Sequence, residues 1–236
     1  MPLDFLPLPG TPVEELDTPA LLIDLPVMER NLKTLHSFFA QRTSKVRPHV
    51  KAHKSPVLAH RQLDAGSTAG GICCAKVGEA EVMVHGGVKN VFIANEIVTR
   101  PKIARLLSLA RDASMMVAVD DPRNVAELSE AAQSQGVNLR AVVDVNVGLD
   151  RCGVEPGPGV VKLAKLVANA PGLQFAGLMG YEGGMWIEGF EERSIETKAR
   201  VQKLVDSREL VERAGLPIEV VSAGGTGTWN ITSEIA

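Results

Sequence analysis

Short apolar runs alternate with helix signals along the chain, and this alternation constrains the fold more than any other feature. Pro56, Pro101 and Pro122 mark helix starts, because a first helical turn tolerates proline. The runs between the helices are rich in β-branched and apolar residues. They lie at 45–51, 71–75, 90–94, 115–119, 140–146, 174–180 and 218–223. Strands that alternate with helices in this way predict a parallel sheet covered by helices.

The residues at the strand ends favour a barrel over an open, doubly wound sheet. Polar residues end almost every expected strand, whereas an open sheet gathers its ligand at one switch point. No Gly-x-Gly-x-x-Gly motif follows the first strand. One further short strand is expected at 19–25, and either this segment closes the barrel or residues beyond the sequence do. We therefore predict a (β/α)8 TIM-type barrel at 19–236 that lacks its last strand, preceded by an N-terminal extension at 1–18.

Composition and charge exclude several classes of partner. Twenty-five basic and 28 acidic residues give a net charge of −3 with no long run of either sign, so a nucleic-acid partner is not expected. No apolar run approaches the roughly 20 residues of a membrane-spanning helix, and the N-terminus lacks a basic leader. Cys73, Cys74 and Cys152 have no Cys-x-x-Cys spacing, which fits buried thiols in a reducing compartment. We expect a cytoplasmic protein with a small-molecule partner.

The most unusual motif is RPHVKAHKSP at 47–56, at the junction of a strand and a helix. His49, Lys51 and His53 occupy alternate positions, so their side chains share one face of a strand. At the mouth of a barrel, burial and neighbouring positive charge would lower the pKa of Lys51 and free its amine to attack a carbonyl. The alternatives are a solvated basic turn and a His-x-Lys-x-His metal site, although lysine is a poor ligand.

A second motif follows the last expected strand, where the chain runs into Gly224-Gly225-Thr226-Gly227-Thr228. Consecutive glycines let backbone N–H groups converge on an anion, and hydroxyls add donors, where barrels commonly bind phosphate. Taken alone, the turn is explained equally well as an ordinary loop. A lysine after the first strand and a phosphate cradle after the last are more informative together.

Two further side chains are expected at the same mouth. Arg151 follows the fifth expected strand, where its guanidinium can hold an anionic oxygen or form a salt bridge to Asp144 or Asp150. Tyr181 is the only tyrosine and follows the sixth strand, where its phenol can hydrogen-bond a ligand or its ring can pack.

Taken together, these residues resemble the fold-type III pyridoxal 5′-phosphate enzymes, the alanine racemase N-terminal domain class. Within that class they resemble the D-threonine aldolase and D-serine dehydratase family. The resemblance covers nearly the whole chain and is carried by DTPALLIDL, RPHVKAHKSP, RQLDAG, GICCAKVGEAE, GGVKNVFIANEIV, VDVNVGLDRCGV, GYEGG and SAGGTGT. The RPHVKAHKSP and GGTGT elements are the more specific ones.

The resemblance implies a role for each candidate site residue. Lys51 is implied as the lysine that binds pyridoxal 5′-phosphate as an imine, with His49 and His53 flanking it and keeping it unprotonated. The other cofactor contacts that it implies are Arg151 at the phenolic oxygen, Tyr181 near the ring, and Gly224, Gly225 and Thr226 at the phosphate.

The activity that the resemblance implies is a lyase for β-hydroxy-D-amino acids, which cleaves Cα–Cβ to give glycine and an aldehyde. The alternatives are a D-serine or 3-hydroxyaspartate dehydratase of the same family and a non-catalytic pyridoxal-phosphate-binding homeostasis protein. Family members continue into a last barrel strand and a C-terminal β domain with a histidine-containing metal site, which this sequence lacks. We therefore expect no metal ligands here, a divalent metal only in a full-length form, a small D-amino acid as substrate, and a homodimer.

Overall fold

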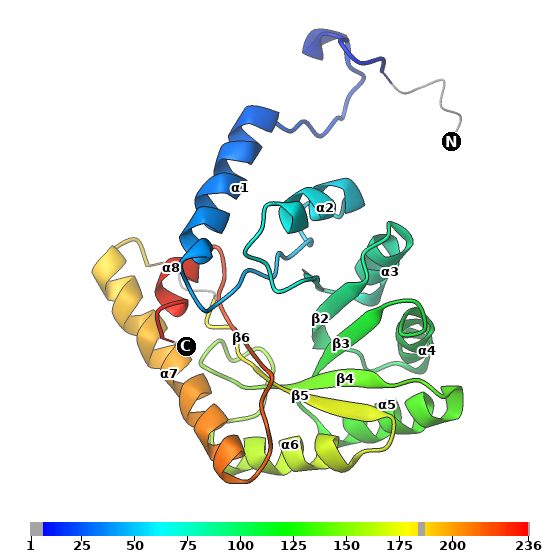
Figure 1. The fold of residues 1–236 in the computed structure, drawn as a ribbon, viewed down its shortest axis with the longest axis vertical. Coiled ribbons are helices and arrows are strands. Elements are labelled where there is room, and N and C mark those ends of the chain that lie inside the picture. The colour runs from blue at the N-terminus through cyan, green and yellow to red at the C-terminus, as the bar shows by residue number, and fades with distance from the viewer. Residues whose placement is uncertain (1–6, 184–186, 236) are drawn as a thin grey trace.

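The computed structural model describes residues 7–183 and 187–235, and its central feature is one parallel sheet. The sheet has six strands in the order β1-β2-β3-β4-β5-β6, so strands that follow one another in sequence also pair in space. The strands are β1 Ile72–Cys74, β2 Asn90–Glu96, β3 Ser114–Val119, β4 Leu139–Asp144, β5 Leu173–Met179 and β6 Val220–Ser222. The sheet curls and helices cover its outer side (Figure 1). The predicted barrel class is confirmed, with the barrel incomplete.

Three helices begin at or next to the prolines that the sequence predicts as helix starts. Ser55 and Asp121 accept backbone N–H groups at the starts of α2 and α5, and each is followed by proline. Gly136, with φ +62°, caps the end of α5. None of the helices within 7–183 and 187–235 is long and apolar enough to cross a bilayer. Their bounds are α1 Leu25–Ala40, α2 Pro56–Asp64, α3 Val77–His85, α4 Arg100–Leu109, α5 Pro122–Gln135, α6 Pro158–Asn169, α7 Phe190–Arg213 and α8 Trp229–Thr232; a 3-10 turn, η2, spans Val13–Glu15.

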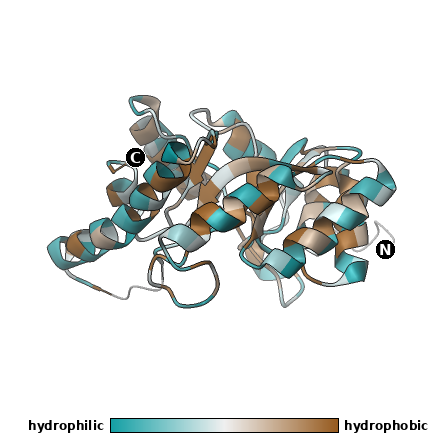
Figure 2. Cartoon of the chain, turned by 90° about the horizontal axis from the view of Figure 1, so that it is seen from below, coloured by the Kyte–Doolittle hydropathy of each residue, from teal (hydrophilic) through white to brown (hydrophobic). Residues whose placement is uncertain are grey.

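Apolar side chains pack on both faces of the sheet. Alternate residues of β2 point to opposite faces, so Val91 and Ile93 join the large core under the helices while Phe92 points into the barrel. In Figure 2 the strands are mainly hydrophobic, whereas the helices carry both hydrophobic and hydrophilic residues. The inner cluster consists of Cys73, Phe92, Met116, Ala118, Val142, Ala176 and Met179. Because both faces are covered, the strands are continuous apolar runs rather than alternating ones.

Two of the expected strands differ from the prediction. The segment 19–25 is not a strand: it runs to the start of α1, and its Leu21, Leu22 and Ile23 side chains are exposed. An apolar run forms a strand only where a neighbouring segment pairs its backbone groups, and no described strand lies beside this one. The segment 45–51 makes only isolated parallel bridges, from Val46 to Thr68 and from His49 to Cys73.

Helical contacts near the two ends of the chain link the two edges of the incomplete barrel. The Phe38 ring on α1 lies 4.7 Å from the Trp229 ring on α8 at 88°, an edge-to-face arrangement, and Phe39 lies 6.0 Å from the same ring. The Ser44 hydroxyl donates to the Ser233 carbonyl at 3.2 Å. The first edge segment therefore contacts the segment that follows β6, even though no strand joins them. The proposed division between extension and barrel at residues 18 and 19 stays a prediction, and residues 1–6 lie outside the described part.

Candidate active site at the carboxyl ends of the strands

Three of the predicted site residues converge at the carboxyl ends of the strands. The Nζ of Lys51 lies 5.8 Å from the centroid of the Tyr181 ring, and the guanidinium carbon of Arg151 lies 5.6 Å from the same centroid. Each residue comes from a different segment: the turn after the first edge, the end of β5 and the loop after β4. Parallel strands of a barrel deliver their carboxyl ends to one mouth, which explains the convergence.

Lys51 lies in a turn that is anchored to β1. The Val50 N–H donates to the Cys73 carbonyl at 2.9 Å, the Cys73 N–H donates to the Pro48 carbonyl at 2.7 Å, and Val50 is fully buried. Lys51 itself is exposed. The expectation that this chain buries Lys51 is therefore wrong, because the turn that anchors Val50 inside directs the next residue outward.

The two histidines beside Lys51 have different neighbours. His49 Nδ1 accepts the backbone N–H of Lys51 at 3.2 Å. Burial, then the positive charge of Lys51, lowers the pKa of His49 to about 4, and Glu79 opposes this shift. His53 accepts the Ser55 N–H at Nδ1 and pairs through Nε2 with Gln62, so its ring is tied to α2. Only His49 of the two hydrogen-bonds to Lys51 among the described residues.

The glycine loop turns two of its N–H groups inward. Gly224 donates its N–H to Glu182 Oε2 at 3.0 Å, and Gly225 donates to the Thr228 hydroxyl at 3.0 Å. The N–H groups of Thr226 and Gly227 have no acceptor among the described residues, and both residues are exposed. The backbone donors available to an anion are therefore the N–H groups of Thr226 and Gly227, not those of Gly224 and Gly225.

The Tyr181 ring is seated against two glycines. A Cβ placed on Gly225 would lie 2.9 Å from Tyr181 Cε2, and one placed on Gly183 would overlap the Tyr181 ring at Cζ. No side chain fits at either position while the ring stays where it is. Gly183 and Gly225 thus allow the end of β5 and the loop after β6 to approach each other around one aromatic ring.

Glu182 is a site residue that the sequence reasoning missed. It is fully buried, and its carboxylate accepts hydrogen bonds from Gly224 N–H, from the Thr228 hydroxyl at 2.8 Å and from the Thr232 hydroxyl. A buried carboxylate requires such partners because desolvation is costly. The signal available in the sequence was an acidic residue placed between a buried strand and a glycine pair.

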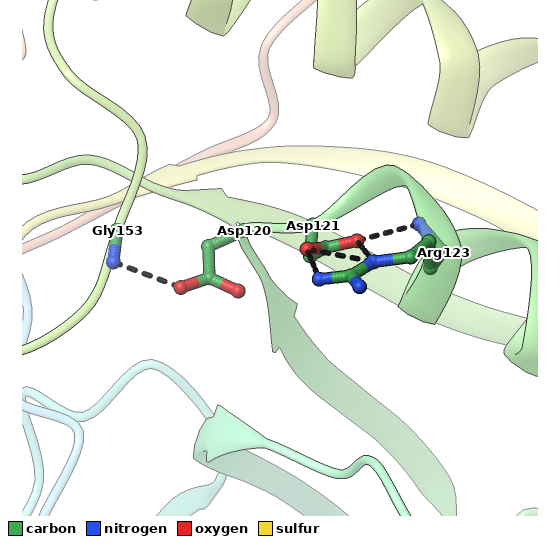
Figure 3. Close-up of polar contacts among 4 residues, drawn as sticks. All are labelled: Asp120, Asp121, Arg123 and Gly153. Atoms are coloured by element: carbon green, nitrogen blue, oxygen red, sulfur yellow. Dashed lines mark hydrogen bonds and ion pairs between the residues drawn. The ribbon is translucent and has the colours of Figure 1, made fainter.

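The loop that carries Arg151 is fastened at two points. Gly153 donates its N–H to Asp120 Oδ2 at 3.0 Å, while the neighbouring Asp121 pairs with Arg123 at the start of α5 (Figure 3). Asn146 Oδ1 accepts the N–H groups of Gly148 and Asp150. Arg151 makes no salt bridge within the described residues, so the alternative pairing with Asp144 or Asp150 is not found.

Three residues with metal-ligand-type side chains lie close together under this loop. Ligand-type atoms of Glu96, Asp144 and Cys152 lie within 4.8 Å of one another, and the Cys152 thiol contacts Asp144 Oδ2 at 3.4 Å. Burial, then the charge of Glu96, raises the pKa of Asp144 to about 7, and burial raises the pKa of Cys152 to about 12. A metal ion that binds here would have to displace the protons that the raised pKa values of Asp144 and Cys152 favour.

The mouth fits a flat, anionic carbonyl cofactor. It combines a primary amine, a guanidinium and an aromatic ring with a glycine loop whose next two N–H groups are free. Gly183 and Gly225 pack against the Tyr181 ring and leave no room for larger side chains at their positions. These groups match the aldehyde, phenolic oxygen, ring and phosphate of pyridoxal 5′-phosphate.

The chain is similar in sequence to known enzymes over nearly its whole length. The chain is 38% identical over 232 residues to a 3-hydroxy-D-aspartate aldolase of Paracoccus denitrificans, covering 98% of this chain and 60% of that protein. It is 37% identical over 221 residues to a D-threonine aldolase of an Arthrobacter species, covering 93% and 58%. The chain thus spans about 60% of the length of these relatives.

Solved structures show the same fold. The crystal structure of D-threonine aldolase from Filomicrobium marinum matches with a TM-score of 0.90 and 40% identity, covering 94% of this chain and 60% of that one. D-threo-3-hydroxyaspartate dehydratase from Delftia sp. HT23 matches with a TM-score of 0.83 and 26% identity, covering 94% and 57%. The family model for the alanine racemase N-terminal domain matches residues 23–232. The chain therefore belongs to the alanine racemase N-terminal domain family of fold-type III pyridoxal 5′-phosphate enzymes.

Proposed function

We propose that this chain is the cofactor-binding barrel of a lyase that cleaves β-hydroxy-D-amino acids between Cα and Cβ, giving glycine and an aldehyde. Relatives at 37–40% identity bear the names D-threonine aldolase and 3-hydroxy-D-aspartate aldolase, which supports this reaction class. The observation that carries the proposal is the position of Lys51 and Arg151, 5.8 and 5.6 Å from one Tyr181 ring, at the mouth of the barrel.

Each cofactor contact is assigned to a residue at the mouth. Lys51 provides the amine for covalent attachment, Arg151 faces the phenolic oxygen, and Tyr181 lies beside the ring. The phosphate is held by the loop at 224–227, through the Thr226 hydroxyl and the N–H groups of Thr226 and Gly227, while Gly224 and Gly225 shape the turn from within. When bound, the cofactor withdraws electrons from Cα and stabilises the charge that remains after a bond there breaks.

The protein groups around Lys51 prepare its amine. His49 is neutral at pH 7 because its pKa is near 4, so it adds no positive charge beside the lysine. Its Nδ1 holds the Lys51 N–H, which fixes the start of the side chain. Arg151 adds a permanent positive charge that attracts an anionic ligand toward the mouth. His53 supports the turn from the α2 side.

A second candidate is dehydration of a β-hydroxy-D-amino acid, in which the α-proton is removed and hydroxide leaves to give a 2-oxo acid and ammonia. The similarity to D-threo-3-hydroxyaspartate dehydratase favours it, at 26% identity and a TM-score of 0.83. The residues at this mouth serve either reaction. A third candidate, a non-catalytic carrier of the cofactor, predicts binding without product.

The metal, the subunit arrangement and the location belong to the same proposal. We propose that a divalent metal acts in a longer form of the protein, because all five histidines of this sequence lie in its first 85 residues. A homodimer in the cytoplasm is proposed together with it, and a D-amino acid is the proposed small-molecule partner.

Product analysis tests the proposed reaction. The chain and a longer form are loaded with pyridoxal 5′-phosphate and Mn²⁺ and supplied in turn with D-threonine and with 3-hydroxy-D-aspartate. Glycine and acetaldehyde from the longer form support the aldolase. A 2-oxo acid with ammonia supports the dehydratase instead, and the absence of any product from a form that binds cofactor and metal contradicts both lyases.

A further inference from the structure

Glu182 stands out among the described residues because it is fully buried and linked to one loop and one short helix. Its two carboxylate oxygens receive three donors: the Gly224 N–H, the Thr228 hydroxyl and the Thr232 hydroxyl. The main-chain carbonyl of Glu182 also accepts from Arg200 on α7 at 3.5 Å. One side chain at the end of β5 thus ties together the loop after β6 and α8.

We propose that Glu182 is the positioning residue of the phosphate loop, which holds 224–228 in the shape that leaves the Thr226 and Gly227 N–H groups free for the cofactor phosphate. This inference rests on the proposed function, since it takes that loop as the phosphate site. Glu182 itself does not touch the phosphate.

The hydrogen bonds explain how one carboxylate sets the direction of several N–H groups. Glu182 receives the Gly224 N–H directly. It also accepts a hydrogen bond from the Thr228 hydroxyl. The oxygen of that hydroxyl in turn accepts the Gly225 N–H at 3.0 Å. Two consecutive N–H groups are therefore directed inward. The next two N–H groups, those of Thr226 and Gly227, have no acceptor among the described residues, and both residues are exposed.

A carboxylate is better suited to this task than a neutral amide. Charged acceptors form hydrogen bonds roughly twice as strong as neutral ones, and here all three donors point at the same group. A glutamine can keep the bond to Gly224 N–H through its oxygen. Its NH2 then faces the two threonine hydroxyls, whose protons lose their acceptor in a buried place. Glu182→Gln therefore keeps the size of the side chain and removes what orders Thr228.

Electrostatic repulsion alone predicts that Glu182→Gln would strengthen phosphate binding rather than weaken it. A negative carboxylate close to a phosphate dianion repels it, so removing the charge would strengthen phosphate binding if repulsion were the dominant effect. The proposal holds that the order of the loop dominates, because the lone pairs of the carboxylate are already occupied by donors from the loop and α8. The two effects are separated by the direction of the change.

The test compares two ligands that differ only in the phosphate. Dissociation constants of pyridoxal 5′-phosphate and of pyridoxal are measured by absorbance for the wild-type chain and Glu182→Gln. Both ligands carry the aldehyde and the ring. The affinity for pyridoxal 5′-phosphate divided by the affinity for pyridoxal, here called the ratio, therefore reports the contribution of the phosphate. We expect the ratio to fall roughly tenfold in the variant, the effect of losing charge-assisted hydrogen bonds. An unchanged ratio, or a ratio that rises, overturns the proposal.

Two further variants keep the test decisive. Glu79→Gln is the matched control, because Glu79 is a buried carboxylate that accepts a backbone N–H from Ala75 at the opposite edge, and we expect its ratio to equal that of wild type. If Glu182→Gln does not fold, Thr232→Val removes one donor to Glu182 from outside the loop. A lowered ratio in Thr232→Val supports the proposal, and an unchanged ratio overturns it.

The outcomes also separate this inference from the proposed function. If wild-type chain binds neither ligand, the proposed cofactor site fails in this chain and the inference falls with it. If wild type prefers the phosphorylated ligand but Glu182→Gln loses affinity for both ligands equally, the cofactor site stands and only the positioning role of Glu182 is overturned.

Discussion

The middle of the sheet and its two edges contribute to the site in different ways. The middle strands β2 to β5 are six or seven residues long and mostly buried. At the edges, the segment 45–51 makes only isolated bridges and β6 has three residues, with Val221 36% exposed. Arg151 and Tyr181 follow middle strands, whereas Lys51 and the glycine loop follow edge segments.

Strand pairing therefore positions one part of the site, and individual hydrogen bonds position the other part. Arg151 and Tyr181 follow strands paired on both sides. Lys51 depends on the two backbone bonds to Cys73, and the glycine loop depends on Glu182. Changes in the middle of the sheet should therefore lower global stability. Changes at the edges should loosen the site at a smaller cost to the fold.

The largest effect on stability is expected from Phe92→Ala in the inner cluster. Phe92 is fully buried, and truncation of a buried aromatic side chain typically costs about 3–5 kcal/mol. Chemical denaturation measures the free energy of unfolding. Phe190→Ala is the matched control, because Phe190 is 55% exposed and its removal should change little. Equal losses in the two variants would contradict the placement of the core.

A smaller effect is expected from Trp229→Ala, which removes the aromatic contacts between α8 and α1. The ring is half-buried, so we expect a loss of about 2 kcal/mol, below that of a fully buried aromatic residue. Hydrogen exchange should show faster exchange in β6 than in wild type, with β3 unchanged. If β3 and β6 loosen together, the edges are not independent of the middle of the sheet.

A local effect on the site is expected from Gly225→Ala. The new methyl group would meet the Tyr181 ring at 2.9 Å, so the ring or the loop must move. We expect roughly tenfold weaker binding of pyridoxal 5′-phosphate, the size of one displaced contact of about 1.4 kcal/mol, with only a small change in the unfolding midpoint. Gly78→Ala on α3 is the control, since its methyl group meets nothing closer than 3.8 Å. Unchanged binding in Gly225→Ala would show that the ring is not seated by this glycine.

The effects of pH have opposite signs in the middle of the sheet and at its edge. The folded pKa of Asp144, at the end of β4, is raised from 3.8 to about 7, so its contribution to stability is present below pH 4 and is lost as pH rises toward 7. The folded pKa of His49 is lowered from 6.5 to about 4, so its contribution is present above pH 6.5 and is lost as pH falls toward 4.

Asp144→Asn separates the two groups. In the variant, the decrease in the free energy of unfolding that Asp144 causes between pH 4 and 7 should disappear. The contribution of His49, which is lost as the pH falls from 6.5 toward 4, should remain. Denaturation at a series of pH values from 4 to 8 measures this. A curve identical to wild type would mean that Asp144 does not hold a proton in the folded chain.

The sequence predicted the fold class and the convergence of Lys51, Arg151 and Tyr181, because each follows an apolar run that ends at the same mouth. It did not predict the role of Glu182, whose partners lie 42 to 50 positions away. It also failed for 19–25, because strand formation depends on a neighbour that local pattern does not contain. The inward direction of the Gly224 N–H depends on the same long-range contact.

The most direct test of the central claim is to find where pyridoxal 5′-phosphate attaches. The chain is mixed with the cofactor, its visible absorption is recorded, and borohydride reduction followed by peptide mass mapping locates the cofactor. The account predicts a yellow protein with the reduced cofactor on Lys51 and none in Lys51→Ala. Attachment to another lysine in a folded, yellow wild-type chain would contradict it.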